Sequence, residues 1–108
     1  MKCESTEIGK NLTFRAPGDL LSTNSLALRI EADALLKLED ARGTEWSVFV
    51  LDLRAARMVD SVGLNVIVTL LRRVQKKGRR MRVECSSPNV FRTFTFTRLD
   101  QLIELVQV

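Results

Sequence analysis

The sequence has no histidine and no tyrosine, and its two cysteines, Cys3 and Cys85, lie far apart. Without histidine, neither a Ser-His-Asp triad nor a Cys-His pair can form. Two cysteines without CxxC spacing are too few for a disulfide scaffold and do not match the common zinc sites. A hydrolase that uses two carboxylates stays open on composition, but no spacing marks such a pair. We therefore expect a protein that is not an enzyme, with no metal and no cofactor.

Glycine clusters and long apolar runs are also absent. The five glycines stand singly, so the chain has neither GxGxxG nor GxxxxGK[ST], the loops that cradle phosphates. No apolar run approaches the ~18–20 residues that span a bilayer, and the first ten residues, MKCESTEIGK, lack the apolar centre of a signal peptide. We expect a cytoplasmic protein that does not insert into a membrane.

What the chain does contain is typical of one globular domain. It has 108 residues, of which 45% are hydrophobic and 28% are charged. A chain of this length buries roughly 60–70% of the surface that it exposes when unfolded, so a core forms without a metal or a disulfide. We expect a single domain over residues 1–108.

The net charge of +4 comes from one segment. Residues 72–82, RRVQKKGRRMR, contain seven basic side chains and no acid, which leaves 10 basic against 13 acidic residues, or −3, in the other 97. This segment could be a solvated helix end, a surface for an acidic partner, or a site for nucleic acid or anionic lipid. Four of its cations finish a helix, where they complement the dipole, and no aromatic side chains are interleaved for base stacking. We therefore favour the solvated helix end and expect no DNA binding.

The first half of the sequence predicts two strands, a helix and a buried strand. Residues 2–8 could form an edge strand that turns at residues 9–11 into a strand over 11–16. Thr23 or Asn24 can cap a helix over residues 24–39, and residues 46–53 form a nearly continuous apolar run typical of a central strand. The apolar stripe expected along the helix is Leu26, Ile30, Ala34 and Leu38, widened by Leu35.

The second half predicts a long helix, a strand, a short helix and a final strand. The long helix follows Asp60 and Ser61, ends before Gly78, and carries a stripe of Val62, Val66, Leu70 and Val74. Strands are expected over residues 81–85 and 101–107, with a short helix from Pro88 to about Phe96 between them. Helices that alternate with strands in this way imply an α/β fold with a mixed or largely parallel sheet.

The positions of other side chains in these elements predict which of them are buried. Phe91 and Phe94 are expected in the core, whereas Phe96 lies near a helix end and could contact a partner. Cys85 ends a strand and is expected to be a buried thiol, and Trp46 is expected to anchor the start of the central strand.

The most informative segment runs from Val50 to Leu64. A buried strand ends there, a short loop follows, and Asp60 and Ser61 stand at the start of a helix. A serine at that position lies beside unpaired backbone N–H groups, which can accommodate a phosphate. Gly63, one turn into the helix, would let a partner or a neighbouring backbone approach closely. Taken alone, the Asp60-Ser61 pair favours simple helix capping, and it is the whole surrounding pattern that points to a function.

The whole pattern resembles the STAS domain of anti-sigma factor antagonists, over nearly the entire chain. Its centre is LDL at residues 51–53, a short connection, and then D-S-x-G-L at residues 60–64, followed by a long amphipathic helix. The other matching segments are Gly18-Asp19-Leu20 before the first helix, Lys77-Gly78 before a strand, Ser87-Pro88, and FTFTRL at residues 94–99. The resemblance implies a sheet of about five strands packed by about three helices.

The resemblance also implies a phosphorylation switch. The serine that matches Ser61 would be phosphorylated by a partner kinase that is itself an anti-sigma factor, and ATP and magnesium would belong to that kinase. The unphosphorylated form would bind the kinase and free the sigma factor, and the phosphorylated form would let go. Asp60 would position the serine hydroxyl. The partner surface is expected to include Asp19, Asp60, Ser61, Gly63, Leu64 and Phe96.

The sequence departs from the family pattern at three places. Leu21 stands where many members carry an acid, Arg98 replaces the glycine usual before Leu99, and the chain stops soon after its last strand. These departures keep an alternative open, namely a docking subunit of a phospholipid-transport ATPase or a sensory complex that works without phosphorylation. The exposed face of the helix over residues 62–74 could also serve a homodimer.

Overall fold

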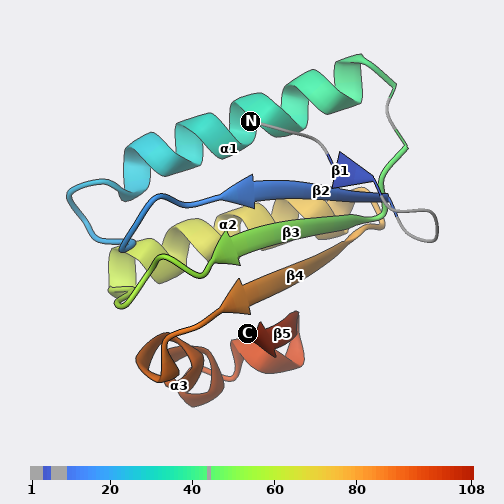
Figure 1. Ribbon diagram of the computed structural model, residues 1–108. Coiled ribbons are helices and arrows are strands. Elements are labelled where there is room, and N and C mark those ends of the chain that lie inside the picture. Colours follow the sequence, from blue (N-terminus) through green and yellow to red (C-terminus); the bar gives the residue numbers. More distant parts are fainter. Residues whose placement is uncertain (1–3, 6–9, 44) are drawn as a thin grey trace.

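The computed structural model describes residues 4–5, 10–43 and 45–108 (Figure 1). The elements are β1 (Glu4–Ser5), β2 (Lys10–Arg15), α1 (Ser25–Ala41), β3 (Val48–Leu53), α2 (Ser61–Lys76), β4 (Arg80–Cys85), α3 (Pro88–Phe96), the 3-10 helix η1 (Leu99–Gln101) and β5 (Glu104–Gln107). Within these residues the strands form one sheet in the order β1-β2-β3-β4-β5. β1 pairs antiparallel with β2, and the other neighbours are parallel, which confirms the expected mixed α/β fold.

Two helices cover one face of the sheet. α1 connects β2 to β3 and α2 connects β3 to β4, and both lie on the same side, as parallel crossovers of one hand require (Figure 1). Phe49, Leu51 and Leu53 of β3 are buried in the core cluster with residues of both helices. The loops after β2 and β3 therefore meet at the same end of the sheet, beside the first turns of α1 and α2 (Figure 1).

The buried face of α1 shares only Leu35 with the stripe that the sequence predicts. Leu26, Ile30 and Leu38 of the expected stripe are 64%, 61% and 52% exposed, and Ala34 is exposed as well. The helix is apolar on two sides, and the side that packs inward consists of Leu28, Ala32, Leu35, Leu36 and the ion-paired Glu39. A spacing of four residues advances 40° beyond a full turn at each step, whereas the buried set mixes spacings of three and four and stays on one face.

Leu36→Ala and Leu26→Ala form a matched test of this assignment. We expect Leu36→Ala to lower the free energy of unfolding by about 2–5 kcal/mol, because it removes a fully buried side chain. Leu26→Ala should change it by less than about 0.5 kcal/mol, because this side chain is mainly in water. Urea denaturation measures both values, and equal losses in the two variants would contradict the assignment.

The other elements differ from the sequence predictions only at their ends. The final strand begins at Glu104 rather than at residue 101, because Leu99–Gln101 form η1. Val62 is 44% exposed, so the buried stripe of α2 starts at Val66. α1 begins after Asn24, and Gly78 adopts a left-handed conformation with φ of 71° after the end of α2. The expected turn at Gly9 and the side chain of Cys3 lie outside the described residues.

The expected core side chains are placed as the sequence predicts. Cys85 and Phe94 are fully buried, and Trp46 is 5% exposed just before β3. Phe91 is half-buried against the same core, and burial raises the pKa of the Cys85 thiol. Phe96 is 87% exposed, so it is free to contact another molecule.

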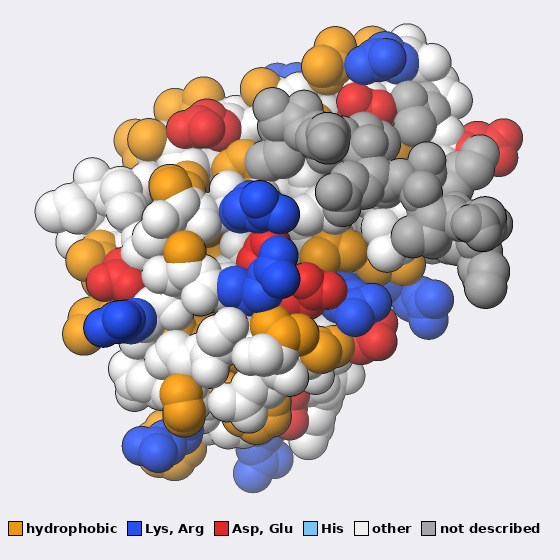
Figure 2. All heavy atoms as spheres, in the orientation of Figure 1, with side chains coloured by type: hydrophobic (Ala, Val, Ile, Leu, Met, Phe, Trp, Pro, Cys, Tyr) orange, Lys and Arg blue, Asp and Glu red, His pale blue; other side chains and the backbone are white. Residues whose placement is uncertain are grey.

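The second face of the sheet carries ion pairs around Asp52. The Asp52 carboxylate is 2% exposed and accepts hydrogen bonds from Arg15 Nε at 3.1 Å and from Arg54 Nη2 at 3.0 Å. On β4, Arg82 Nε lies 3.3 Å from a carboxylate oxygen of Glu84. Figure 2 shows acidic and basic side chains side by side near the middle of this view. Burial alone would raise the pKa of Asp52, but the hydrogen bonds from Arg54 and Arg15 outweigh it and hold the pKa below 3.8.

This lowered pKa makes stability depend on pH in acid. Asp52 titrates at a lower pH in the folded than in the unfolded chain, so the unfolded state takes up the proton first. The stability contributed by the charged Asp52 is therefore present above about pH 4–5 and is lost as the pH falls toward the folded pKa. We expect Asp52→Asn to be less stable than the wild type at pH 7 and to lose less stability between pH 5 and pH 2.5. Urea midpoints measured across this range check both expectations, and parallel pH curves for the two proteins would contradict them.

Candidate functional site

The loop before α1 is attached to the loop before α2 by backbone hydrogen bonds. The Leu20 N–H donates to the Met58 carbonyl at 3.1 Å, and the Asp60 N–H donates to the Leu20 carbonyl at 3.0 Å. Leu20 and Val59 thus form an isolated parallel bridge, although residues 17–24 and 54–60 belong to separate connections. This bridge fixes the position of the backbone immediately before Ser61.

Gly63 allows this close approach. A Cβ atom at Gly63 would lie 2.6 Å from the Leu20 carbonyl oxygen and 2.9 Å from the Leu20 Cβ. Real Cβ atoms essentially never approach a backbone atom so closely, and a carbonyl that is already hydrogen bonded cannot move away freely. Of the two roles that the sequence suggests for Gly63, the structure supports the approach of a neighbouring backbone.

The Asp60 carboxylate connects the same two segments. Its Oδ1 accepts a hydrogen bond from the Gly63 N–H at 2.9 Å and caps α2, and its Oδ2 accepts one from the Ser22 N–H at 2.8 Å. The Gly63 and Ser22 N–H groups together hold the pKa of Asp60 below its ordinary value, because they stabilise the charged form. We call Asp60 and these two N–H groups the Asp60 clamp.

Asp19 makes a second connection between the loops. Its Oδ1 accepts hydrogen bonds from the Arg57 N–H at 2.7 Å and the Met58 N–H at 3.2 Å. Asn24 closes the loop that carries Asp19, because its amide donates to the Asp19 carbonyl at 2.7 Å and accepts from the Leu21 N–H at 2.9 Å. Asp19 and Asp60 therefore hold residues 57–63 from two sides.

Ser61 lies on the surface above this arrangement. It is the first residue of α2 and is exposed, and no hydrogen bond of its hydroxyl group is recorded with the described residues. Met58 is 50% exposed, Val62 is 44% exposed and Leu64 is half-buried. A partner that contacts Ser61 would also meet apolar side chains that are available for burial.

The structure brings most of the predicted site residues together. The two connected loops and the first turn of α2 carry five of them, namely Asp19, Asp60, Ser61, Gly63 and Leu64. Phe96 is placed differently, because it ends α3 and belongs neither to these loops nor to the core.

Sequence reasoning missed Ser22 and the exposed Met58, and it gave Asn24 as a helix cap, whereas the Asn24 side chain makes no capping hydrogen bond. The hydrogen bond from the Ser22 N–H to the Asp60 carboxylate forms only when the two loops meet, whereas the hydrogen bonds of Asn24 lie within its own loop. The run of polar residues in Leu21-Ser22-Thr23-Asn24 could have indicated a hydrogen-bonded loop, since Asn and Ser side chains commonly bond to nearby backbone groups.

The basic segment 72–82 is largely paired with acids. Arg73 Nη1 lies 2.7 Å from Asp33 on α1, and Arg79 Nη1 lies 2.9 Å from Asp40. The Arg79 guanidinium also stacks over the Trp46 ring, 4.0 Å from its centroid. These contacts join α2 and the turn before β4 to α1 and Trp46, so part of the positive charge serves packing between elements and is not free for a polyanion.

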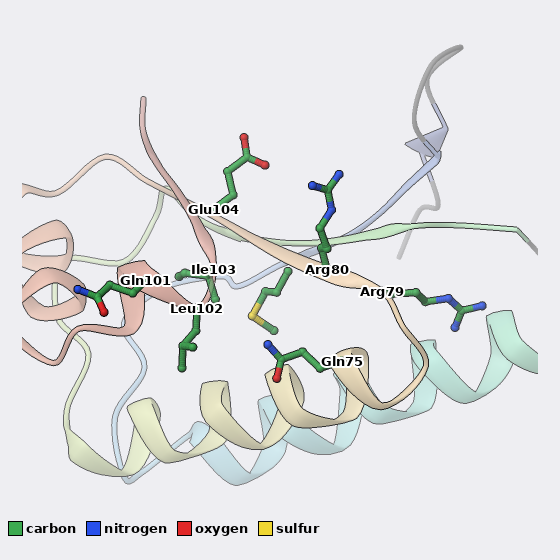
Figure 3. A pocket seen from close by; sticks show the side chains of 8 residues that line it. Gln75, Arg79, Arg80, Gln101, Leu102, Ile103 and Glu104 are labelled. Atoms are coloured by element: carbon green, nitrogen blue, oxygen red, sulfur yellow. The ribbon is translucent and has the colours of Figure 1, made fainter.

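A hollow at the opposite end of α2 is lined by basic, acidic, neutral polar and apolar side chains together. It has a volume of about 260 Å³ and lies between the end of α2, the start of β4 and η1. Figure 3 shows Arg80 and Glu104, of opposite charge, on one side and Gln75 with Leu102 on the other.

The described part of the chain offers neither a metal site nor a membrane-spanning helix. Residues 4–5, 10–43 and 45–108 contain no group of three acidic, cysteine or histidine side chains placed to hold a metal ion. Among the same residues, no helix has both the length and the apolar character needed to cross a membrane.

A model of the STAS domain family matches residues 2–108, which is nearly the whole chain. The chain belongs to the STAS domain family. This agrees with the resemblance seen in the D-S-x-G-L segment and explains why that segment lies at the start of α2 in the fold described above. A comparison with curated proteins found no match.

Solved structures share the fold. A candidate anti-sigma factor antagonist from Thermotoga maritima superposes with a TM-score of 0.73 at 19% identity, covering 91% of this chain and 80% of that chain. A sulfate transporter family protein from Wolinella succinogenes gives 0.67 at 16%, covering 91% and 78%. The anti-sigma factor antagonist SpoIIAA in its unphosphorylated form gives 0.58 at 16%, covering 88% and 81%. At these identities the similarity shows a common fold.

Two departures from the STAS pattern have clear structural settings. Arg98 adopts a left-handed conformation with φ of 63°, which a glycine would adopt without strain. Leu21, where many members carry an acid, is half-buried and its N–H is held by Asn24. Among the described residues, Asp19 and Asp60 are acids whose carboxylates bond to the segment around Ser61.

Replacing Gly63 tests the contact on which this site depends. We expect Gly63→Ala to lower the free energy of unfolding by about 1–3 kcal/mol, because the clash with Leu20 outweighs the higher helix propensity of alanine. Gly18→Ala is the matched control, since a Cβ there would meet nothing within 4 Å. It should leave stability unchanged or raise it by up to about 1 kcal/mol. A Gly63→Ala protein as stable as the wild type in urea would disprove the close approach.

Proposed function

We propose that this STAS protein is a regulatory module without enzymatic activity that binds an anti-sigma factor with serine kinase activity and is released by phosphorylation of Ser61. The observation that carries the proposal is the placement of Ser61. It is exposed at the first turn of α2, on loops that Asp19 and Asp60 hold in place, with apolar side chains beside it.

The rigidity of the site favours recognition of Ser61 by another protein. Residues 57–63 are held by four hydrogen bonds to the Asp19 and Asp60 side chains and by the bridge to Leu20. A serine on such a loop is presented in one backbone conformation, so a kinase loses little free energy in ordering it. Met58 and Val62 supply apolar surface for the docked state.

Electrostatics suggest how a phosphate would act. A phosphoserine adds about −1.5 to −2 charge at pH 7. At Ser61 that charge would stand next to the Asp60 carboxylate and would compete with it for N–H groups at the start of α2. The phosphate would therefore alter the charge and the hydrogen bonds of the docking surface, whereas the core of the sheet lies beneath and is not reached.

The solved structures support the same reading by their fold. Two of the three are described as anti-sigma factor antagonists, and one of them as an unphosphorylated form, which is the state that the proposal assigns to the binding-competent chain. The structure from Wolinella succinogenes is described as a sulfate transporter family protein, so the same fold also occurs in that family. This observation keeps the docking subunit as the second candidate function.

Charge variants at Ser61 distinguish the two candidates. We would purify tagged wild type, Ser61→Ala and Ser61→Asp from cells of the source organism and identify bound proteins and phosphorylated peptides by mass spectrometry. We expect phosphate on Ser61 in the wild type. The wild type and Ser61→Ala should retain a serine kinase, and Ser61→Asp should retain at least tenfold less of it.

Ser47→Asp is the control for added charge. Ser47 is exposed just before β3, at the end of the sheet away from Ser61, so this variant should retain the kinase. If both Asp variants and Ser61→Ala retain the same transport or sensory protein, the chain is a docking subunit and Ser61 only begins the helix. Equal phosphate incorporation in Ser61→Ala and the wild type would exclude Ser61 as the modified residue.

A further inference from the structure

A hollow of about 620 Å³ lies between the loop after β3 and the loop after β4. It is at the carboxyl ends of two neighbouring parallel strands, the place where open α/β sheets commonly bind ligands. The described residues that line it include no acid. Its polar lining consists of Arg54, Arg57, Ser86, Ser87 and Asn89, with Pro88 and two alanines beside them.

The lining is held in place before any ligand arrives. Asp52 accepts hydrogen bonds from Arg54 Nε at 3.1 Å and Nη2 at 3.0 Å, which directs the guanidinium. The Asn89 amide donates to the Arg57 carbonyl at 3.2 Å and so joins the two walls. Because Ser87 caps α3 through the Asn89 N–H, the start of that helix also faces this region. A preorganised set of donors binds an anion with less loss of entropy.

The described lining of the hollow contains two arginines and no acid. Asp52 is shared between Arg15 and Arg54. The Asp19 carboxylate accepts hydrogen bonds from the backbone N–H groups of Arg57 and Met58. Arg54 and Arg57 both line the hollow, Arg54 is paired with Asp52, and no ion pair of the Arg57 side chain is recorded among the described residues.

We propose that this hollow binds an oxyanionic group, a carboxylate or a phosphate, between Arg57, the serine hydroxyls and the start of α3. Arginine is suited to this because its planar guanidinium offers two parallel donors to either group. The serine hydroxyls and the amide of Asn89 add neutral donors around the same space.

When the chain is docked to the protein partner of the proposed function, the bound oxyanion would be the carboxylate of an acidic side chain of that partner. This part of the inference rests on the proposed function. Arg57 precedes Ser61 by four residues, so their Cα atoms are at most about 15 Å apart. A standard interface covers about 800 Å² on each partner, which is a disc of roughly 16 Å radius. A partner centred on Ser61 would therefore reach Arg57, and covering a cation without an opposing acid is unfavourable.

Titrations observed by two-dimensional NMR of the ¹⁵N-labelled full chain test the proposal. The probes are inorganic phosphate and a short acetylated glutamate peptide, each compared with sodium chloride at equal ionic strength. We expect saturable shifts of the Arg57, Ser86 and Asn89 amide signals, and binding at least fivefold weaker in Arg57→Gln. Arg72→Gln, which removes an exposed arginine of α2, should bind like the wild type.

The outcomes separate the sources of the anion. Tighter binding of the peptide supports a carboxylate of a partner, and tighter binding of phosphate supports a free phosphate ion. Shifts that do not saturate, or equal binding by Arg57→Gln and the wild type, overturn the proposal. The same spectra report whether each variant is folded. The titrations involve neither Ser61 nor a kinase, so their result is independent of whether the proposed function holds.

Discussion

The contact between Leu20 and Gly63 is the constraint on which the site depends. The Leu20 carbonyl occupies the space that any side chain at position 63 would need, and it accepts the Asp60 N–H at the same time. Because the two loops touch here, the Asp60 carboxylate can reach both Gly63 and Ser22. A residue larger than glycine would separate the loops, and the Asp60 clamp could not form as it does.

The molecule separates its stable parts from its adjustable surface. The sheet carries a core against α1 and α2 on one face and ion pairs around Asp52 on the other. Further ion pairs from Asp33 and Asp40 join α1 to α2 and to the turn before β4. None of these contacts involves Ser61. A charge added to Ser61 would therefore act on the Asp60 clamp and on a docked partner, which is the behaviour that a reversible switch needs.

The sequence predicted the elements of the fold better than their contacts. The buried run before Leu53, the cap at Asp60 and the stop at Gly78 follow from local rules, and all three are confirmed. The buried face of α1 was predicted wrongly, because leucine occurs on both sides of the helix and only packing decides between them.

The contacts of the site depend on residues that are far apart in the sequence. The contacts of Ser22 with Asp60 and of Arg79 with Asp40 join residues about forty positions apart, so no local pattern reveals them. The resemblance of D-S-x-G-L to STAS domains indicated the candidate site, but the approach of Leu20 became evident only in the structure.

The central claim is that phosphate on Ser61 acts through the Asp60 clamp and leaves the core unchanged. The most direct test is to prepare the protein with phosphoserine at position 61 and to measure amide hydrogen exchange by NMR against the unmodified protein. The account predicts faster exchange at Ser22 and Gly63, whose N–H groups bond to Asp60, and unchanged exchange at Phe49 and Val83 in the sheet. Unchanged exchange at Ser22 and Gly63, or faster exchange throughout the sheet, would contradict it.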